Sequence, residues 1–521
     1  MSVDPSKRVQ ITGKELRTLQ DRIKSRGLAD GDYDLLLGLT EAVERLSLAL
    51  AERDASLGRV CKLIFCAPTE TAKNILKHPP APRAEKNEDE PKPKGHGRKP
   101  ASAYEGAGRV IIEHPDLKSE DLCPGCEKGK VYEMAMPSVF VHIKGAAPLS
   151  ATVYERTRLR CNLCGEIYTP ELPKDVGDKK FDDSATAMVA LLKYGCGLPL
   201  FRMQNLQANL GHPVPTSTQW DILNIAAVGL SPVRDALLQY AAQGQLIHND
   251  DTTMKVLSLL KEKDPESTRK GIFTTGIISK YQGHDIAVFL TGNRHAGENL
   301  TELLRQRAMG LSPPIQMCDA ASRNASKEFE SIMANCLTHA RRQFVELIDH
   351  FPDDCAYVIE QLGKVYHHDA IVKVQKLSPE KRLVYHQEHS GPVMDDLYTW
   401  CKKQIDEKHV EPNSGLGKAI KYMLNHWEKL TRFLQVSGAP LDNNLCERAL
   451  KYAILHRKNA LFYKTQRGAY VGDLFMSLIH TCQLAGVNPL DYLTWLLRNA
   501  PNLVKSAENF MPWNYPAARP E

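Results

Sequence analysis

Apolar residues recur at helical spacing through most of the chain and change to strand-like spacing in one central stretch. Apolar side chains three and four positions apart predict helices over much of 182–242 and 326–440. Between them, 245–257 predicts a strand, the β-rich runs 271–281 and 284–293 predict two more, and 314–322 predicts a fourth, with a helix predicted at 296–308 before the last of these. The expected order is strand, strand, strand, helix, strand.

Near the start of the chain, apolar residues follow a heptad-like pattern. They alternate in steps of three and four, with Arg53 filling one position: Leu36, Leu39, Val43, Leu46, Leu50, Leu57, Val60 and Ile64. A dimerising coiled coil and an amphipathic helix packed on its own domain explain this seam equally well. A separate helix is expected just before Gly31.

Residues 77–106 are rich in proline and charge and contain no large aliphatic residue, which predicts a linker. Its Arg98 and Lys99 are candidate DNA contacts, although a basic linker is more often simply solvated. Further along, Thr216 and Ser217 precede a helix after a turn, so residues 176–242 are a candidate helix-turn-helix region.

Two Cys-x-x-Cys pairs, Cys123 with Cys126 and Cys161 with Cys164, have the spacing of a tetrahedral zinc site. Short strands expected at 137–145 and 151–161 would complete a DNA-binding zinc ribbon over 107–175, held by one structural Zn²⁺. Four unrelated buried cysteines and a redox motif are the alternatives. The odd total of 13 cysteines argues against a disulfide framework.

Three carboxylates stand out by their positions. The strand order is that of a ribonuclease-H-like sheet, in which Asp250 on the first strand and Asp319 at the end of the fourth would be adjacent. Glu447 follows on a helix expected to start near residue 443. Because neighbours on a strand point to opposite faces, only one of Asp250 and Asp251 can face such a site, and we favour Asp250.

Carboxylates brought together in this way are suited to two Mg²⁺ ions that clamp the oxygens of a phosphoryl transfer. Cations around Glu447 and in the preceding helical region are candidate phosphate contacts: Arg341, Arg342, Arg448, Lys451, Arg457 and Lys458. A solvated helix in which Glu447 only pairs with Lys451 is the alternative. Cys336 and His339 have metal-ligand spacing but no matching pair close in sequence, so packing and a hydrogen-bonding role are the favoured explanation.

Composition bounds these interpretations. A chain of 521 residues predicts two to four domains, and 42% hydrophobic with 25% charged residues is typical of a soluble globular protein. A net charge of +5 indicates nucleic acid only weakly. The sequence predicts neither a membrane span nor a signal peptide, so we expect a cytoplasmic protein.

The predicted organisation is a multidomain α+β protein. Its expected parts are a helical region that is a candidate for coiled-coil dimerisation (1–76), the linker (77–106), the zinc ribbon (107–175), a helical region (176–242), a ribonuclease-H-like core (243–325 and 441–475), a helical insertion (326–440) and a C-terminal helical region (476–521).

Several stretches resemble successive blocks of a known family: IHNDDT, MCDAASRN, ANCLTHARRQF, LDNNLCERALKYAILHRKNALF and SLIHTCQLAGVNPLDYL. They look like blocks of the bacterial insertion-sequence-66 family of DDE transposases. The GHGRKP segment and the two cysteine pairs resemble the amino-terminal half of that family, so the resemblance covers nearly the whole chain.

This resemblance implies that Asp250, Asp319 and Glu447 bind catalytic Mg²⁺ and that the chain cleaves and transfers DNA strands at the inverted repeats of its element. Double-stranded DNA, a second copy of the chain and small accessory proteins of the element are the implied partners, in a bacterial cytoplasm and on the nucleoid.

This sequence departs from the family pattern beside both aspartates. Asn249 and Asp251 stand where the first block usually has Ala and Glu, and Ala320-Ala321 replace the usual Gly-Tyr after Asp319. All three acids are present, so activity is expected. An end-binding repressor with a decayed nuclease core, or a nuclease without transfer activity, would fit the same motifs.

Overall fold

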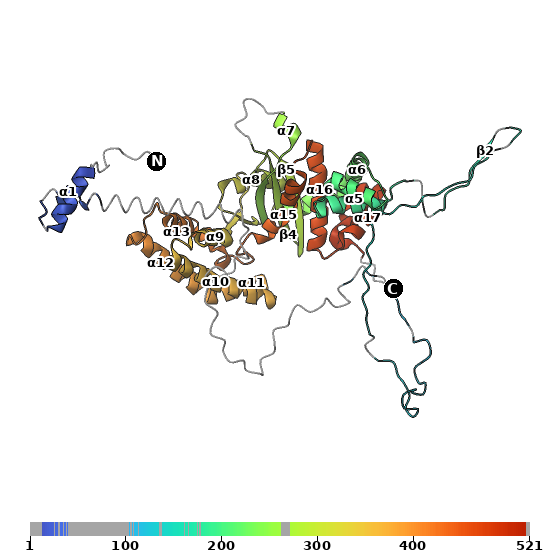
Figure 1. The fold of residues 1–521 in the computed structure, drawn as a ribbon, viewed down its shortest axis with the longest axis horizontal. Coiled ribbons are helices and arrows are strands. Elements are labelled where there is room, and N and C mark those ends of the chain that lie inside the picture. The colour runs from blue at the N-terminus through green and yellow to red at the C-terminus, as the bar shows by residue number, and fades with distance from the viewer. Residues whose placement is uncertain are drawn as a thin grey trace. The chain divides into compact units, whose positions relative to one another are not determined.

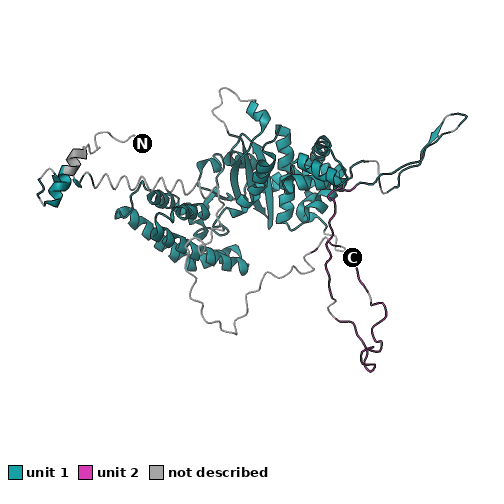
Figure 2. Ribbon diagram, in the orientation of Figure 1, with its two compact units in different colours: residues 1–78, 151–521 teal, residues 79–150 magenta. Residues whose placement is uncertain are grey.

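The computed structural model describes residues 13–39 and 104–516 with short gaps. The gaps are residues 26, 30, 31, 35, 38, 105, 106, 108, 113, 135–137, 161, 165, 175, 177, 178 and 262–270. The chain forms two compact units, residues 79–150 and residues 1–78 with 151–521 (Figures 1 and 2). The predicted seam beyond Leu39 and the predicted linker, apart from Tyr104, lie outside the described residues.

A five-stranded mixed sheet forms the centre of the larger unit (Figure 1). Its strands, β3 (Leu246–Thr253), β4 (Phe273–Tyr281), β5 (His284–Gly292), β6 (Ile315–Cys318) and β7 (Ile332–Asn335), lie in the order β5-β4-β3-β6-β7. Strands β3, β4 and β5 are antiparallel neighbours, whereas β6 runs parallel to β3 and β7 runs parallel to β6. The result is a mixed α/β architecture.

The predicted order of three strands, a helix and a fourth strand is confirmed, with α8 (Ala296–Leu304) as the helix. Strand β7 was not predicted, and it lies inside the stretch assigned to a helical insertion. Its four residues are too few to show a strand period, and the helical pattern of the following residues dominates the local sequence.

Different helices cover the two faces of the sheet. On one face, Asn299 of α8 donates to Thr275 Oγ1 at 2.7 Å, and Ser279 Oγ donates at 2.6 Å to the carbonyl of Ala241 in α6 (Thr216–Ala242). On the other face, α15 (Asn444–Ala460) packs on Gly276, where an added Cβ would lie 3.0 Å from Leu450 Cδ2. Consecutive residues of one strand therefore meet different helices.

Helix α16 (Gln466–Leu484) covers the outer edge of β5. Three backbone N–H groups of β5, those of Ala287, Phe289 and Thr291, donate to side chains of Thr481, Ser477 and Asp473 at 3.1, 3.0 and 2.7 Å. The acceptors recur every four residues, so they lie along one face of the helix. This helix satisfies edge groups that would otherwise invite pairing with another chain.

A helical segment with its own core lies between β7 and α15. It consists of α9 (Leu337–Leu347), α10 (Pro352–Val374), α11 (Pro379–His389), α12 (Gly391–Asp406), α13 (Gly415–Asn425), α14 (Trp427–Leu430) and the 3₁₀ turn η5 (Arg432–Leu434). Fully buried residues such as Phe344, Leu362 and Leu397 fill this core. Inside it, Asp369 of α10 pairs with Arg382 of α11 at 2.9 Å.

Most of the remaining helices pack around α6 and α16. The remaining helices and turns are α1 (Gly13–Lys24), α4 (Asp183–Ala190), the π-helix η3 (Leu191–Gly195), α5 (Leu200–Asn209), α7 (Leu257–Lys261), α17 (Pro489–Arg498), α18 (Ala500–Ser506), and the 3₁₀ turns η6 (Ala507–Phe510) and η7 (Pro512–Asn514). Helices α5 and α6 are joined by a turn, and α6 begins at Thr216, as expected. Leu223, Leu230 and Leu237 are fully buried, so α6 is also a core helix.

The strands predicted at 137–145 and 151–161 are wrong except at one end. The only regular strands described between residues 138 and 170 are β1 (Leu159–Arg160) and β2 (Ile167–Tyr168), which form an antiparallel pair. The side chains of Phe140, Ile143 and Val153 are 75 to 88% exposed. Among the described residues, their β-branched and aromatic pattern has no neighbouring strand to pair with, so propensity alone does not produce a sheet. Across the described residues, none of the helices combines the length and apolarity needed to cross a bilayer.

Gly297 lets α8 contact the backbone that follows β6. A Cβ at this position would lie 2.2 Å from the carbonyl oxygen of Ala325 and 2.7 Å from that of Arg323. We expect Gly297→Ala to lower the free energy of unfolding by about 1–3 kcal/mol, because rigid backbone must move to make room. Urea denaturation of the purified protein measures this change.

Gly363 of α10 is the matched control. An added Cβ there meets no described atom within 4 Å, so Gly363→Ala should raise stability by roughly 0.5–1 kcal/mol through helix propensity alone. Equal effects of the two substitutions would show that close packing at Gly297 is not limiting.

Candidate active site

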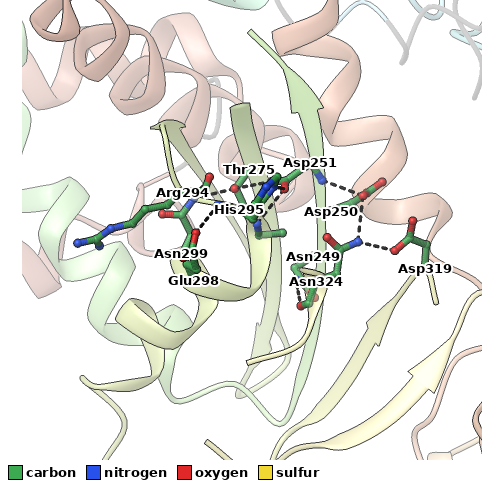
Figure 3. Close-up of polar contacts among 11 residues, drawn as sticks. Asn249, Asp250, Asp251, Thr275, Arg294, His295, Glu298, Asn299, Asp319 and Asn324 are labelled. Carbon is green, nitrogen blue, oxygen red and sulfur yellow. Dashed lines mark hydrogen bonds and ion pairs between the residues drawn. The ribbon is translucent and has the colours of Figure 1, made fainter. Parts of the chain in front are cut away.

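Asp250 and Asp319 lie at the same level of two neighbouring parallel strands. His248 of β3 is in register with Met317 of β6, and each aspartate follows two residues later. Residues two apart on a strand share a face, so both carboxylates lie on the same side of the sheet. Figure 3 shows them on either side of Asn324, whose amide Nδ2 donates to Asp319 Oδ1 at 2.5 Å and to Asp250 Oδ1 at 3.4 Å.

Asp251 points to the opposite face, towards α8 (Figure 3). Its side chain is 1% exposed and accepts hydrogen bonds from Thr275 Oγ1 at 2.7 Å and from the backbone N–H of Ala296 at 2.9 Å. His295 Nδ1 lies 3.2 Å away. A carboxylate at a helix N-terminus is stabilised by the unpaired N–H groups there, so Asp251 holds α8 on the sheet.

Glu447 lies in the first turn of α15, which begins one residue after the predicted start. Asn443 fixes this turn to β3, because its Oδ1 lies 3.0 Å from His248 Nδ1 and its Nδ2 donates to the carbonyl of Asn249 at 3.2 Å. The helix that carries the third acid is therefore attached next to Asp250 on the central strand.

The three acids influence one another electrostatically. Burial, together with the charges of Asp319, Asp251 and Glu447, raises the pKa of Asp250 to about 7, against a lowering by the backbone N–H of Asp251. Glu447 Oε1 is buried and accepts no hydrogen bond from the described residues. A cation placed among these carboxylates would relieve both the repulsion and the unmet hydrogen-bonding capacity.

Glu447 also belongs to a second candidate set of metal ligands. Cys336, His339 and Glu447 each offer one ligand atom, and these atoms lie within 4.8 Å of one another. Burial raises the pKa of the Cys336 thiol to about 11, and its Sγ accepts a hydrogen bond from the backbone N–H of Asn443 at 3.2 Å. The thiol form is a poor ligand, so the carboxylate and imidazole are the better donors. The sequence prediction set Cys336 and His339 aside because no matching pair of ligands lies close to them in the chain, and Glu447 is brought to them only by the fold.

Two family models match this chain. Residues 179–471 match the family model described as Transposase IS66 family, and residues 477–513 match the IS66 C-terminal element. The chain belongs to the IS66 transposase family. The match spans Asp250, Asp319 and Glu447, and it excludes both cysteine pairs of the predicted ribbon.

Similar proteins of Sinorhizobium fredii (strain NBRC 101917 / NGR234) are known by sequence. The uncharacterized protein y4hP is 27% identical to this IS66-family chain over 79% of the chain and 75% of its own length. The uncharacterized protein y4jD is 26% identical over 70% of the chain and 72% of its own length. These relatives extend the similarity beyond the family model without adding a described activity.

The cations predicted to bind DNA differ in their surroundings in this IS66-family protein. Arg448, Lys451 and Lys458 are exposed along α15. Arg457 instead holds α15 on the end of β3, where its Nη1 donates to Thr252 Oγ1 at 3.1 Å. The other predicted contacts are Arg341, which is buried in α9, Arg342, which is half-buried there, and Arg98 and Lys99, which lie outside the described residues.

The predicted zinc ligands are divided between the two units. In the smaller unit, Cys123 and Cys126 lie in a turn closed by a hydrogen bond from Cys123 N to Gly129 O at 2.7 Å. Backbone N–H groups of Lys128 and Gly129, together with the Cys123 side chain, lower the pKa of Cys126. In the larger unit, Cys164 lies in the connection between β1 and β2, and Cys161 lies outside the described residues.

The raised pKa of Asp250 makes the stability of the metal-free protein depend on pH. The folded chain holds the Asp250 proton more tightly than the unfolded chain, so this contribution to stability is lost as pH rises from about 4 through about 7. The Asp250→Asn side chain is neutral at every pH. We therefore expect the variant to gain stability relative to the wild type as pH rises from about 5 to about 8, measured by urea unfolding in EDTA.

Mg²⁺ provides the control for this comparison. At a pH of about 8, it should stabilise the wild type more than Asp250→Asn, because only the wild type offers the full set of charged ligands. Parallel pH profiles for the two proteins in EDTA would contradict the burial of Asp250 among like charges.

Proposed function

We propose that this IS66-family chain is an active DDE transposase that binds the inverted repeats at the ends of its own element and cleaves and transfers DNA strands there. The observation that carries this proposal is the convergence of Asp250, Asp319 and Glu447 on one face of the sheet. They come from β3, from the residue after β6 and from the first turn of α15. They are distant in the chain, and the sheet and the attachment of α15 bring them together.

The sheet supports a ribonuclease-H-like core. Three antiparallel strands in chain order are followed by a helix and two strands that add in parallel on the other side of β3. This arrangement puts the first and fourth strands side by side, where the two aspartates meet. The helical segment between β7 and α15 then corresponds to the proposed insertion before the third acid.

The donor set fits divalent cations. Asp250 and Asp319 each accept hydrogen bonds through Oδ1 only, so among the described residues Oδ2 of each has no hydrogen-bond partner. With the buried Glu447 Oε1, they offer oxygen ligands of the kind that Mg²⁺ prefers. Two bound Mg²⁺ ions would supply charge stabilisation at the attacking and leaving oxygens of a phosphoryl transfer.

The chain's own residues have separate roles in this proposal. The three carboxylates bind the metal ions. Arg448, Lys451 and Lys458 bind the phosphates of the DNA next to these carboxylates. Glu447, Lys451 and Lys458 lie within one stripe of α15, since positions four, seven and eleven residues apart fall close together around a helix. A DNA backbone bound along this stripe is brought to the third acid.

The amino-terminal parts complete the proposed transposase. The lowered pKa of Cys126 supports a thiolate, which is the form that binds Zn²⁺, and we propose one structural Zn²⁺ held by Cys123, Cys126, Cys161 and Cys164.

A transposase must hold two DNA ends, so a dimer or higher oligomer on DNA is the proposed working unit. Accessory proteins of the same element are the further proposed partners.

Single substitutions of the three acids test the proposed activity. We expect Asp250→Asn, Asp319→Asn and Glu447→Gln each to abolish cleavage of a supercoiled plasmid that carries the element's ends, in Mg²⁺, because each removes a charged ligand. DNA binding should be unchanged or tighter, because repulsion of phosphate decreases. Gel-shift and plasmid-cleavage assays on the same preparations separate the two effects.

Asp395→Asn, an exposed position on α12, is the matched control and should cleave like the wild type. A wild type that binds the element's ends but never cuts them would favour an end-binding repressor instead. Cleavage by Glu447→Gln at the wild-type rate would remove Glu447 from the ligand set.

The exposed lysines of α15 test the proposed path of the DNA. We expect the double substitution Lys451→Gln with Lys458→Gln to weaken binding to all DNA sequences alike, and to reduce the slope of log affinity against log salt by about two. Fluorescence anisotropy across a salt series measures both quantities. The control is Lys505→Gln on α18, which is exposed and should leave the slope unchanged.

A further inference from the structure

Asn324, the last residue of the MCDAASRN stretch, connects the two aspartates of the site. It ends the 3₁₀ turn η4 (Ser322–Asn324), which follows β6, and it is fully buried. Its amide Nδ2 lies 2.5 Å from Asp319 Oδ1 and 3.4 Å from Asp250 Oδ1 (Figure 3). One amide group, which carries two protons, can therefore donate to both carboxylates.

The same two oxygens are also held by backbone donors. Asp250 Oδ1 accepts from the N–H of Asp251 at 2.8 Å, and Asp319 Oδ1 accepts from the N–H of Ala321 at 3.1 Å. Each Oδ1 thus has a backbone donor and a share of the Asn324 amide. The hydrogen bonds all go to one oxygen of each carboxylate, which fixes the rotation of the carboxylate and leaves the other oxygen for a ligand.

Asn324 is itself held in place through its main chain. Its carbonyl oxygen accepts from Asn249 Nδ2 at 2.8 Å and from Gln316 Nε2 at 2.7 Å, and Gln316 Nε2 also donates to Asn249 Oδ1 at 2.9 Å. Asn249 and Gln316 are both fully buried, on the two strands that lead to the aspartates. This network fixes the backbone of Asn324 independently of its side chain.

We propose that Asn324 is a positioning residue that orients Asp250 and Asp319 for a divalent cation. This inference rests on the proposed function, because it assumes that these two carboxylates are metal ligands. The hydrogen bonds of Asn324 go to the Oδ1 atoms, so they persist when the Oδ2 atoms bind an ion. Without them, the carboxylates rotate more freely and must be ordered when the ion binds.

The expected effect is on metal affinity rather than on folding. Residues that hold metal ligands in place typically change affinity or activity by roughly 10- to 100-fold when they are replaced. We expect Asn324→Ala to weaken Mn²⁺ binding by that amount and to raise the Mg²⁺ concentration needed for half-maximal plasmid cleavage by a similar factor. Near-wild-type cleavage should return at saturating Mn²⁺, because the ligands themselves remain.

The experiment titrates Mn²⁺ into the metal-free full-length protein and follows free Mn²⁺ by electron paramagnetic resonance. Asn335→Ala is the matched control: Asn335 is 3% exposed and donates at 3.3 Å to the main-chain oxygen of Asp319, not to its carboxylate. It should bind Mn²⁺ with nearly wild-type affinity. If Asn324→Ala does not fold, as judged by circular dichroism, Asn324→Ser replaces it, since a shorter hydroxyl side chain also lacks the bridging amide.

The outcomes separate the two levels of the proposal. Asp319→Asn should lose Mn²⁺ binding, and if it binds like the wild type, the carboxylate site itself is wrong. If Asp319→Asn loses binding but the folded Asn324 variant binds Mn²⁺ like the wild type, only the positioning role is refuted. A loss of cleavage by the Asn324 variant that saturating Mn²⁺ does not restore, with Mn²⁺ affinity unchanged, would also refute it.

Discussion

The burial of mutually repelling acids on the central strands of the sheet is the constraint on which the surroundings of this site depend. Burial and the charges of Asp319, Asp251 and Glu447 together raise the pKa of Asp250 to about 7. A fold that keeps such groups close must offset the repulsion with donors or cations. Here the donors are backbone N–H groups and the Asn324 amide, and in our proposal the remaining charge is offset by bound metal.

Specific contacts also hold the elements around the site in place. Asn249 and Gln316 hold the backbone of Asn324, Asn443 attaches α15 to β3, and Gly297 lets α8 contact the residues around Asn324. Each contact joins an element that carries an acid, or that supports one, to the central pair of strands. Buried polar networks of this kind specify a unique arrangement only when nearly all of their members are satisfied.

Local sequence predicts the parts of this fold that have long, uniform patterns. Strands β4 and β5 are nine residues each and contain β-branched runs, so the sequence predicts the order of these elements. It also predicts the start of α15 after Asn443. The four residues of β7 carry no such pattern. The stretch around Phe140 has the residue types of a strand, but among the described residues it has no strand partner, so the strand predicted there was wrong. Sheet formation depends on neighbours that local sequence does not reveal.

The same distinction applies to the site. Asp250 and Asp319 follow from strand order, because parallel neighbours bring their ends together, and the alternation of side chains separates Asp250 from Asp251. Asn324 and the pairing of His339 with Glu447, whose Nδ1 and Oε1 lie 3.7 Å apart, depend on contacts between distant segments. Asparagine is common in turns, so Asn324 carries no local signal of its role.

Asp250 and Asp251 are neighbours on β3, but one is a proposed metal ligand and the other holds a helix on the sheet. Asp251 is surrounded by donors from Thr275, His295 and Ala296, so its charge is fully used in holding α8. Asp250, one residue earlier, has a single backbone donor at 2.8 Å and a longer contact with Asn324 at 3.4 Å. Its charge is less well compensated by the protein, and a carboxylate in that condition gains most from a cation. The difference between them arises from the face of the strand alone, so a one-residue shift in the register of β3 would exchange the two roles and remove the first acid from the site.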